Sequence, residues 1–242
     1  MALGSQPRWT VRPAVGGVRA DIDVGLREHM LRIYNYMASG LALTGIVAYV
    51  FAQSGFYAQV AATPLIWLIM LAPLGFVMAI SFGLQRMQAS TAQLLFWLFA
   101  GVMGLSLASI FLVFTGASIA RVFFITAGTF AAMSLYGYTT KRDLSQFGSF
   151  LMMGLIGIII ASLVNMFIAS SALHFAISVI GVVVFVGLTA WDTQSIKQQY
   201  FELQYADGQT ASKASIMGAL RLYLDFINLF MMLLQLLGAR RD

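Results

Sequence analysis

Apolar residues in this chain form long uninterrupted tracts rather than alternating with polar ones. Seven tracts reach or approach the roughly 20 residues that a helix needs to cross the hydrocarbon core of a bilayer. They lie at residues 34–53, 64–84, 93–114, 117–138, 147–169, 172–191 and 216–237. Strands of a membrane barrel are shorter and alternate in polarity. Because backbone groups in lipid must be hydrogen-bonded within their own segment, the pattern predicts an all-α bundle of seven transmembrane helices.

The segments outside these tracts complete the expected domain organisation. Residues 1–33 contain arginines but no apolar core, so they do not resemble a signal peptide. They are expected to form a cytoplasmic N-terminal tail with a short interfacial helix at 21–33. Residues 34–238 then form the transmembrane domain, and residues 239–242 form a C-terminal tail.

The composition supports this class and removes several others. The 242 residues are 60% hydrophobic and 10% charged, whereas a soluble domain has about 25% charged residues. The net charge of +5 comes from separated short segments, so we expect no nucleic-acid partner. The absence of cysteine and the presence of only two histidines exclude disulfides, thiolate sites and histidine-rich metal clusters. The lipid bilayer is the expected partner, and no bound cofactor is expected.

Lysine and arginine residues indicate the orientation, because they concentrate in cytoplasmic loops. Loops 54–63 and 170–171 contain neither residue type. If every tract crosses, the tail and the loops on the other side of the membrane hold most of the basic residues: Arg8, Arg12, Arg19, Arg27, Arg32, Arg86, Lys141, Arg142, Lys197 and Lys213. We therefore expect a cytoplasmic N-terminus in a bacterial inner membrane. Arg240 and Arg241 end on the opposite side if all seven segments cross, so either the first helices dominate the topology or the last segment crosses incompletely. Seven crossings are favoured.

Two aspartates at membrane depth are the most informative polar residues. Asp225 lies about eight residues, or roughly 12 Å, into the last tract, and Asp192 ends the sixth. Because antiparallel neighbours place both in the cytoplasmic half, the carboxyls can meet. Two carboxyls in a poorly hydrated site share one proton, and the dianion formed at higher pH repels itself. The pattern predicts a titratable latch, and the dianion could also supply oxygen ligands to Ca²⁺.

Each of these residues also has an ordinary structural interpretation. Arg221 lies one helical turn before Asp225, so an ion pair within the helix could neutralise that carboxylate. Asp192 could be a solvated residue at a span boundary. Arg86 ends the second tract, where it is either a latch for the acidic pair or a positive-inside anchor. Either arginine is thus a candidate counter-ion. Asn165 and Asn228 are candidates for interhelical hydrogen bonds, and Asn228 shares a face with Asp225.

Three stretches resemble the transmembrane Bax inhibitor motif family. They read "LYLDFINLF" at 222–230, "WDTQSIK" at 191–197 and "KRDLSQFGSFLMMGLIGIIIASLVNMF" at 141–167. The resemblance covers about residues 30–238 and is closest to a bacterial member. It implies a seven-helix bundle with the last helix central, and a Ca²⁺ leak controlled by pH.

The same resemblance assigns roles to individual residues. It implies that Asp192 and Asp225 are the pH sensor. It also implies that a basic residue at the end of the second helix holds the closed state. Arg86 is the nearest match to that position, although a shift of one residue would place Gln85 there. The second tract contains no glutamate, although some members of the family have one.

The leading functional hypothesis is therefore a pH-sensitive cation leak channel, with Ca²⁺ as the permeant ion. A proton-coupled transporter of small solutes is an alternative, in which the same aspartates carry protons stoichiometrically. A non-conducting regulator of membrane proteases or stress responses is another. An enzyme is not expected, because the chain has no glycine-rich phosphate loop, no H-E-x-x-H motif and no lysine in the last tract.

Overall fold

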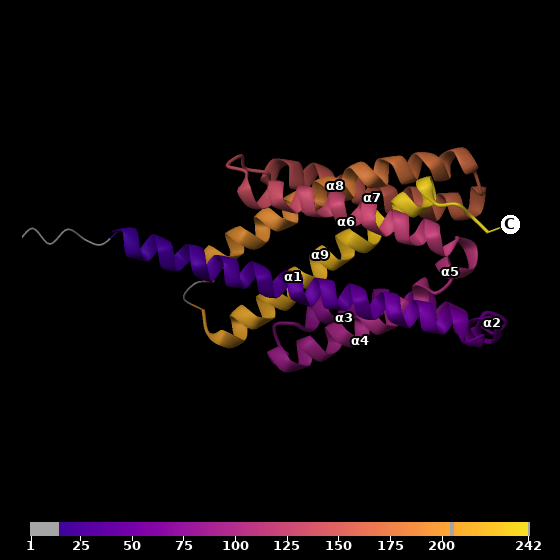
Figure 1. Ribbon diagram of the computed structural model, residues 1–242, viewed down its shortest axis with the longest axis horizontal. Helices are drawn as coiled ribbons and strands as arrows, with labels where there is room; N and C mark the ends of the chain where they lie inside the picture. The colour runs from indigo at the N-terminus through magenta and orange to yellow at the C-terminus, as the bar shows by residue number, and fades with distance from the viewer. Residues whose placement is uncertain (1–14, 204–205, 242) are drawn as a thin grey trace, which may run out of the picture.

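The computed structural model describes residues 15–203 and 206–241, with side chains from Val24 onward. The part of the predicted tail at residues 1–14 lies outside the described residues. Within the described ranges the chain forms helices joined by short turns, which confirms the all-α prediction (Figure 1). The helices are α1 (Val15–Gln53), α2 (Phe56–Ala61), α3 (Leu65–Gly83), α4 (Ala89–Leu107), α5 (Ile110–Val113), α6 (Gly116–Thr139), α7 (Ser145–Ile168), α8 (Ser171–Glu202) and α9 (Gly208–Leu237).

Seven segments of the described chain are long and apolar enough to cross a membrane. They are α1 from Val24, α3, the segment Ala89–Val113 that joins α4 and α5, and α6, α7, α8 and α9. The prediction of seven spans is therefore confirmed. The third span is interrupted where α4 ends and α5 begins, at residues 108–109.

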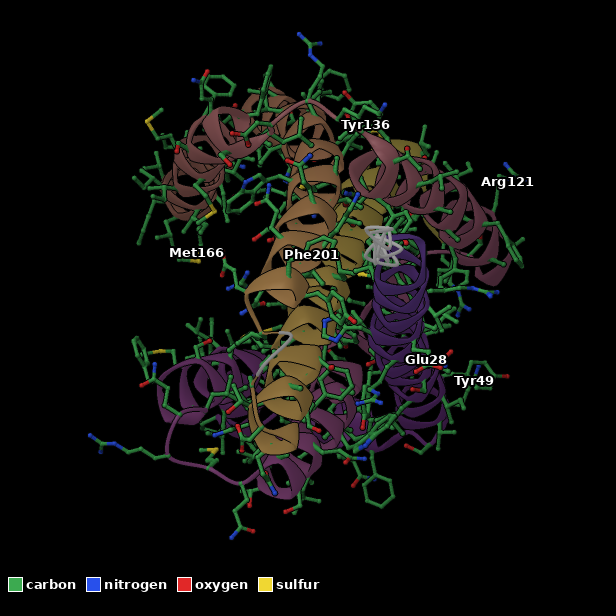
Figure 2. All side chains as sticks on the ribbon, turned by 90° about the vertical axis from the view of Figure 1, so that its left-hand side faces the viewer. Glu28, Tyr49, Arg121, Tyr136, Met166 and Phe201 are labelled. Atoms are coloured by element: carbon green, nitrogen blue, oxygen red, sulfur yellow. The ribbon has the colours of Figure 1, made fainter. Side chains whose placement is uncertain are left out.

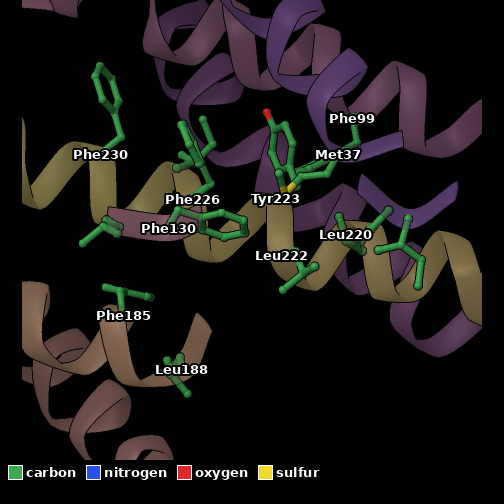
Figure 3. Close-up of a cluster of buried hydrophobic side chains, with 14 of the residues drawn as sticks. Met37, Phe99, Phe130, Phe185, Leu188, Leu220, Leu222, Tyr223, Phe226 and Phe230 are labelled. Carbon is green, nitrogen blue, oxygen red and sulfur yellow. The ribbon is translucent and has the colours of Figure 1, made fainter. Parts of the chain in front are cut away.

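Helix α9 is the central element of the bundle. It runs obliquely through the molecule and packs against α1, α4, α6 and α8 (Figure 1). In its most apolar window 56% of the residues are buried, against 11% in α3 and α7, which expose most of their apolar surface. Figure 3 shows Leu222, Tyr223 and Phe226 of α9 within the apolar core. The last helix is thus central, as the resemblance implied.

Helix α1 begins before its apolar span, which starts at Val24, and continues through it without a break. Leu26, Met30, Ile33 and Met37 recur every three or four residues and are all buried, so one apolar face runs through the expected boundary at residue 33. The segment 21–33 is therefore the early part of α1 and not a separate interfacial helix.

Helices α8 and α9 are longer than their apolar tracts. Hydropathy ends the sixth tract at residue 191, but α8 continues to Glu202, and α9 begins at Gly208 instead of near residue 216. The added turns are polar and remain helical, because a helix needs no apolar residues where it leaves the membrane. Asp192 is consequently not at a helix end but about 15 Å before it.

The C-terminal residues are hydrogen-bonded to the turn between α5 and α6 and to the start of α6. Ala239 O accepts a hydrogen bond from Thr115 N at 3.0 Å, and Arg241 N donates to Val113 O at 2.9 Å. Ala239 N donates to Ser118 Oγ at 2.8 Å. This end of the molecule lies opposite the start of α1 (Figure 1). The last helix therefore ends at the end of the bundle opposite the start of α1, and residues 239–241 form a clasp instead of a free tail.

Deleting residues 239–242 is expected to destabilise the protein by about 1.5–4.5 kcal/mol, because each of the three lost hydrogen bonds contributes about 0.5–1.5 kcal/mol. The thermal midpoint in detergent should fall. The double substitution Arg240→Ala, Arg241→Ala keeps the backbone bonds and should leave the midpoint near that of the parent. An equal loss in both variants would show that the guanidinium groups, and not the backbone clasp, hold this end.

Candidate functional site

The structure brings Asp192 and Asp225 together between α8 and α9. These two helices pack against one another along much of their length. Asp192 is 8% exposed and Asp225 is 5% exposed, and the two carboxyl groups lie close enough for their charges to interact. Leu222 and Phe226, which flank Asp225 along α9, are both buried in the apolar core (Figure 3).

The carboxyl of Asp225 is left partly unsatisfied. Its Oδ2 is the one buried side-chain oxygen or nitrogen in the described ranges that has no hydrogen-bond partner. An unpaired buried carboxylate oxygen is costly, because it has lost its water without gaining a donor. A proton held between the two aspartates would supply that donor. The arrangement can therefore exist as a bonded pair that holds one proton or as two carboxylates that repel each other.

Arg221 is the cation that acts on both carboxyl groups. It lies one turn before Asp225 on α9, and its side chain is exposed. The exposed guanidinium therefore acts on the buried pair from outside it. This position favours the ionised form of the aspartates without neutralising either of them in a closed ion pair.

Arg86 does not reach the acidic pair in this structure. Its turn, between α3 and α4, is attached to the start of α9, where Lys213 Nζ donates to Gln85 O at 3.4 Å and Ala89 N donates to Gln209 Oε1 at 3.0 Å. Lys213 precedes Asp225 by roughly 18 Å of helix rise. The side chain of Arg86 is exposed at this end of the bundle. Of the two candidate counter-ions, the structure places only Arg221 beside the pair.

The two asparagines do not make the interhelical hydrogen bonds that we expected. Asn228 Nδ2 donates to Leu224 O of its own helix at 2.8 Å. Asn165 Oδ1 accepts from Ser170 N at 3.0 Å, so it closes the turn between α7 and α8. The prediction was wrong because helical backbone carbonyls and turn amides offer nearer partners than a neighbouring helix.

Residues next to Asp192 form contacts that the sequence did not reveal. Thr193 Oγ1 lies 3.0 Å from Ser134 Oγ, which in turn lies 2.5 Å from the Tyr34 hydroxyl, so three hydroxyls link α8, α6 and α1. Gln194 accepts from Leu144 N and donates to Arg142 O, both at 2.8 Å. The motif around Asp192 thus also joins α8 to α6, α1 and the α6–α7 turn.

A second hydroxyl group is buried in the core on the other side of α9. The Tyr223 hydroxyl lies 2.6 Å from Thr44 Oγ1, which also donates to Ala100 O at 2.8 Å. These two bonds join α9 to α1 and α1 to α4, at the level of Tyr223, which precedes Asp225 by two residues. The only signal in the sequence was a polar side chain at membrane depth, which does not identify a partner.

The site offers few ligands for a tightly bound metal ion. No group of three or more histidine, cysteine, aspartate or glutamate side chains suited to a metal gathers in the described ranges. Ca²⁺ takes six to eight oxygen ligands in proteins. The two aspartates can supply only part of such a shell, which suits brief contact with a passing hydrated ion better than permanent binding.

These features define a polytopic α-helical membrane protein with a buried acidic pair in its last two spans. Residues 26–242 match the sequence model of the family described as "Inhibitor of apoptosis-promoting Bax1". The chain belongs to this Bax inhibitor family.

Bacterial relatives match the chain over most of their length. The chain is 53% identical to protein RP147 of Rickettsia prowazekii (strain Madrid E), over 91% of this chain and 93% of that protein. It is 50% identical to the inner membrane protein YbhL of Escherichia coli (strain K12), over 90% and 94%. It is 33% identical to the membrane protein SpyM3_0260 of Streptococcus pyogenes serotype M3, over 89% and 94%.

Proposed function

We propose that this protein is a pH-sensitive leak pathway for cations, above all Ca²⁺, gated by protonation of Asp192 and Asp225. One observation carries the proposal: two buried carboxyls face each other, and Asp225 Oδ2 has no partner. At low pH the pair holds a proton and joins α8 to α9. At higher pH the proton leaves, the two charges repel, and the helices separate near the pair.

Ca²⁺ fits this proposal as the transported ion and not as a bound cofactor. Two carboxylates attract a divalent cation, and their few ligands allow it to leave again. Little positive charge competes with a passing cation at the pair, because Arg221 is the cation that acts on it. The activity requires no bond making or breaking in a substrate, so we propose no enzymatic role and no resident cofactor.

We propose that the protein resides in a bacterial inner membrane with its N-terminus in the cytoplasm. The E. coli relative bears the name of an inner membrane protein. Arg27, Arg86, Arg142 and Lys197 all lie toward the end of the bundle where α1 starts, which suits the positive-inside rule. The acidic pair would then lie on the cytoplasmic half of the bundle.

Flux of Ca²⁺ into proteoliposomes across a pH series tests the gate. Release of one proton can raise the flux of the parent by up to about tenfold per pH unit. In Asp192→Asn and Asp225→Asn an amide replaces the titratable group and can still bond to the remaining carboxyl. Both variants should therefore lose the pH dependence and stay near the low flux of the protonated parent.

Asp143→Asn is the matched control for this experiment. Hydrogen bonds from the hydroxyl and the backbone N–H of Ser145 hold the pKa of Asp143 below its usual range, so this exposed carboxylate stays ionised between pH 5 and 8. Its replacement removes a charge without removing a titration in that range, and the pH response should persist. A pH response that survives in both Asp192→Asn and Asp225→Asn would refute the gate. Proton movement in fixed ratio to Ca²⁺ would identify a coupled transporter instead.

A further inference from the structure

A lateral groove of about 970 Å³ opens between α1 and α6. Helices α1 and α6 each pack on α9, which forms the floor of the groove through the buried ring of Phe226. Figure 2 looks along the bundle and shows these helices on the same side of it, with Glu28 and Tyr49 on α1 and Tyr136 and Arg121 on α6. The groove belongs to neither α7 nor the acidic pair.

Small residues keep the groove open. Its walls include Ala38, Ala42 and Gly45 of α1 and Ala127 and Ala131 of α6. These side chains are too short to meet across the space between the two helices. Both helices are membrane spans, and the lining is mainly apolar, so the space lies where lipid tails and not water would fill it.

One end of the groove carries positive charge. Arg27, in the first turn of the α1 span, is exposed and lines this end together with Tyr138. Lys197 Nζ donates to Tyr138 O at 2.8 Å and lies 5.2 Å from the centre of the Tyr138 ring. Its remaining N–H groups are free to bind a further acceptor. From Arg27 to Ile46, at the far end, the groove follows α1 for roughly 28 Å, which is about the thickness of the hydrocarbon core.

We propose that this groove binds an anionic phospholipid of the surrounding bilayer. The acyl chain lies against the small residues of α1 and α6, and the phosphate headgroup lies at the end of the groove that Arg27 and Tyr138 line. Charge complementarity selects an anionic lipid, because the exposed Arg27 lines one end of an otherwise apolar groove and Lys197 adjoins Tyr138 at that same end. The inference is independent of the proposed gate, since it concerns neither Asp192 nor Asp225.

Native mass spectrometry of the full-length protein in detergent tests the lipid preference. We expect the parent to retain phosphatidylglycerol more strongly than phosphatidylcholine with the same acyl chains. Arg27→Gln should weaken phosphatidylglycerol binding about fivefold, the effect of one basic residue near a lipid surface, and leave phosphatidylcholine unchanged. Arg32→Gln is the control, because Arg32 lies on the same helix but faces a different crevice. Equal binding of both lipids, or equal losses in both variants, would overturn the proposal.

Filling the groove tests the place of binding. Ala131→Phe puts a ring into the space and should reduce the retention of both lipids, whereas Ala132→Phe, at an exposed neighbouring position that does not line the groove, should not. Unchanged thermal midpoints would show that both variants remain folded. Lipid retention that is unaffected by Ala131→Phe would overturn the proposal. So would a mass spectrum dominated by lipid-free dimers, which would identify a second copy of the chain as the occupant.

Discussion

Replacing Arg221 by methionine is expected to raise the pH midpoint of Ca²⁺ flux. The guanidinium acts on both Asp192 and Asp225 and favours their ionised form. Without it the pair keeps its shared proton to higher pH, so the closed state persists further into the neutral range. A nearby opposite charge favours the ionised form of an acid, and the exposure of Arg221 limits the size of the effect. Methionine keeps the apolar part of the side chain.

The matched control for this prediction is Arg86→Met. Arg86 lies at the α3–α4 turn, which is attached to the start of α9 far from the pair. Its removal should leave the midpoint within experimental error of the parent. The proteoliposome pH series described above measures both variants. A shift in Arg86→Met with none in Arg221→Met would contradict the assignment, because it would require a closed state in which Arg86 holds the pair.

Substituting alanine for Gly137 is expected to destabilise the bundle by about 1–3 kcal/mol, the usual cost of overpacking a well-packed site. Helices α6 and α8 approach so closely here that a Cβ on Gly137 would overlap the carbonyl oxygen of Ala190 and lie 3.0 Å from its Cα. Backbone atoms cannot rotate away as a side-chain end can, so the two helices must separate. Thermal unfolding in detergent measures the loss. Ala190 precedes Asp192 by two residues, so the pH response of flux should also change.

Gly128→Ala on the same helix isolates that contact. A Cβ there meets no atom within 4 Å, and alanine favours a helix by roughly 0.5–1 kcal/mol over glycine. Both substitutions remove the same backbone freedom, so the difference between them reports the contact with Ala190. We expect Gly128→Ala to unfold at or slightly above the parent midpoint. A lower midpoint in Gly128→Ala than in Gly137→Ala would show that close packing of α6 on α8 does not limit stability.

The sequence predicted the acidic pair more completely than its surroundings. Asp192 and Asp225 were identifiable because a carboxyl in an apolar tract is expensive, and the last two helices had to be antiparallel neighbours. The counter-ion could not be chosen in the same way. Arg86 and Arg221 both lie on the expected side, and only the attachment of the α3–α4 turn to Gln209 and Lys213 separates them.

Contacts between helices explain most of what the sequence did not predict. Thr193, Ser134 and Tyr34 are distant in the chain, and their hydroxyls meet only because α1, α6 and α8 pack at particular rotations. Hydropathy also ended the sixth tract at residue 191, because it measures affinity for lipid and not helical conformation. The structure extends that helix to Glu202.

The sequence by itself determined that this chain forms seven membrane helices and that two acids lie within the last two. Those features follow from local properties: the length of apolar tracts and the cost of charge in lipid. Tertiary structure decided which cation lies beside the acids, which hydroxyls bond, and where a groove remains open between α1 and α6. These depend on how each helix is rotated and how closely it approaches its neighbours, and many residues far apart in the chain set that packing together.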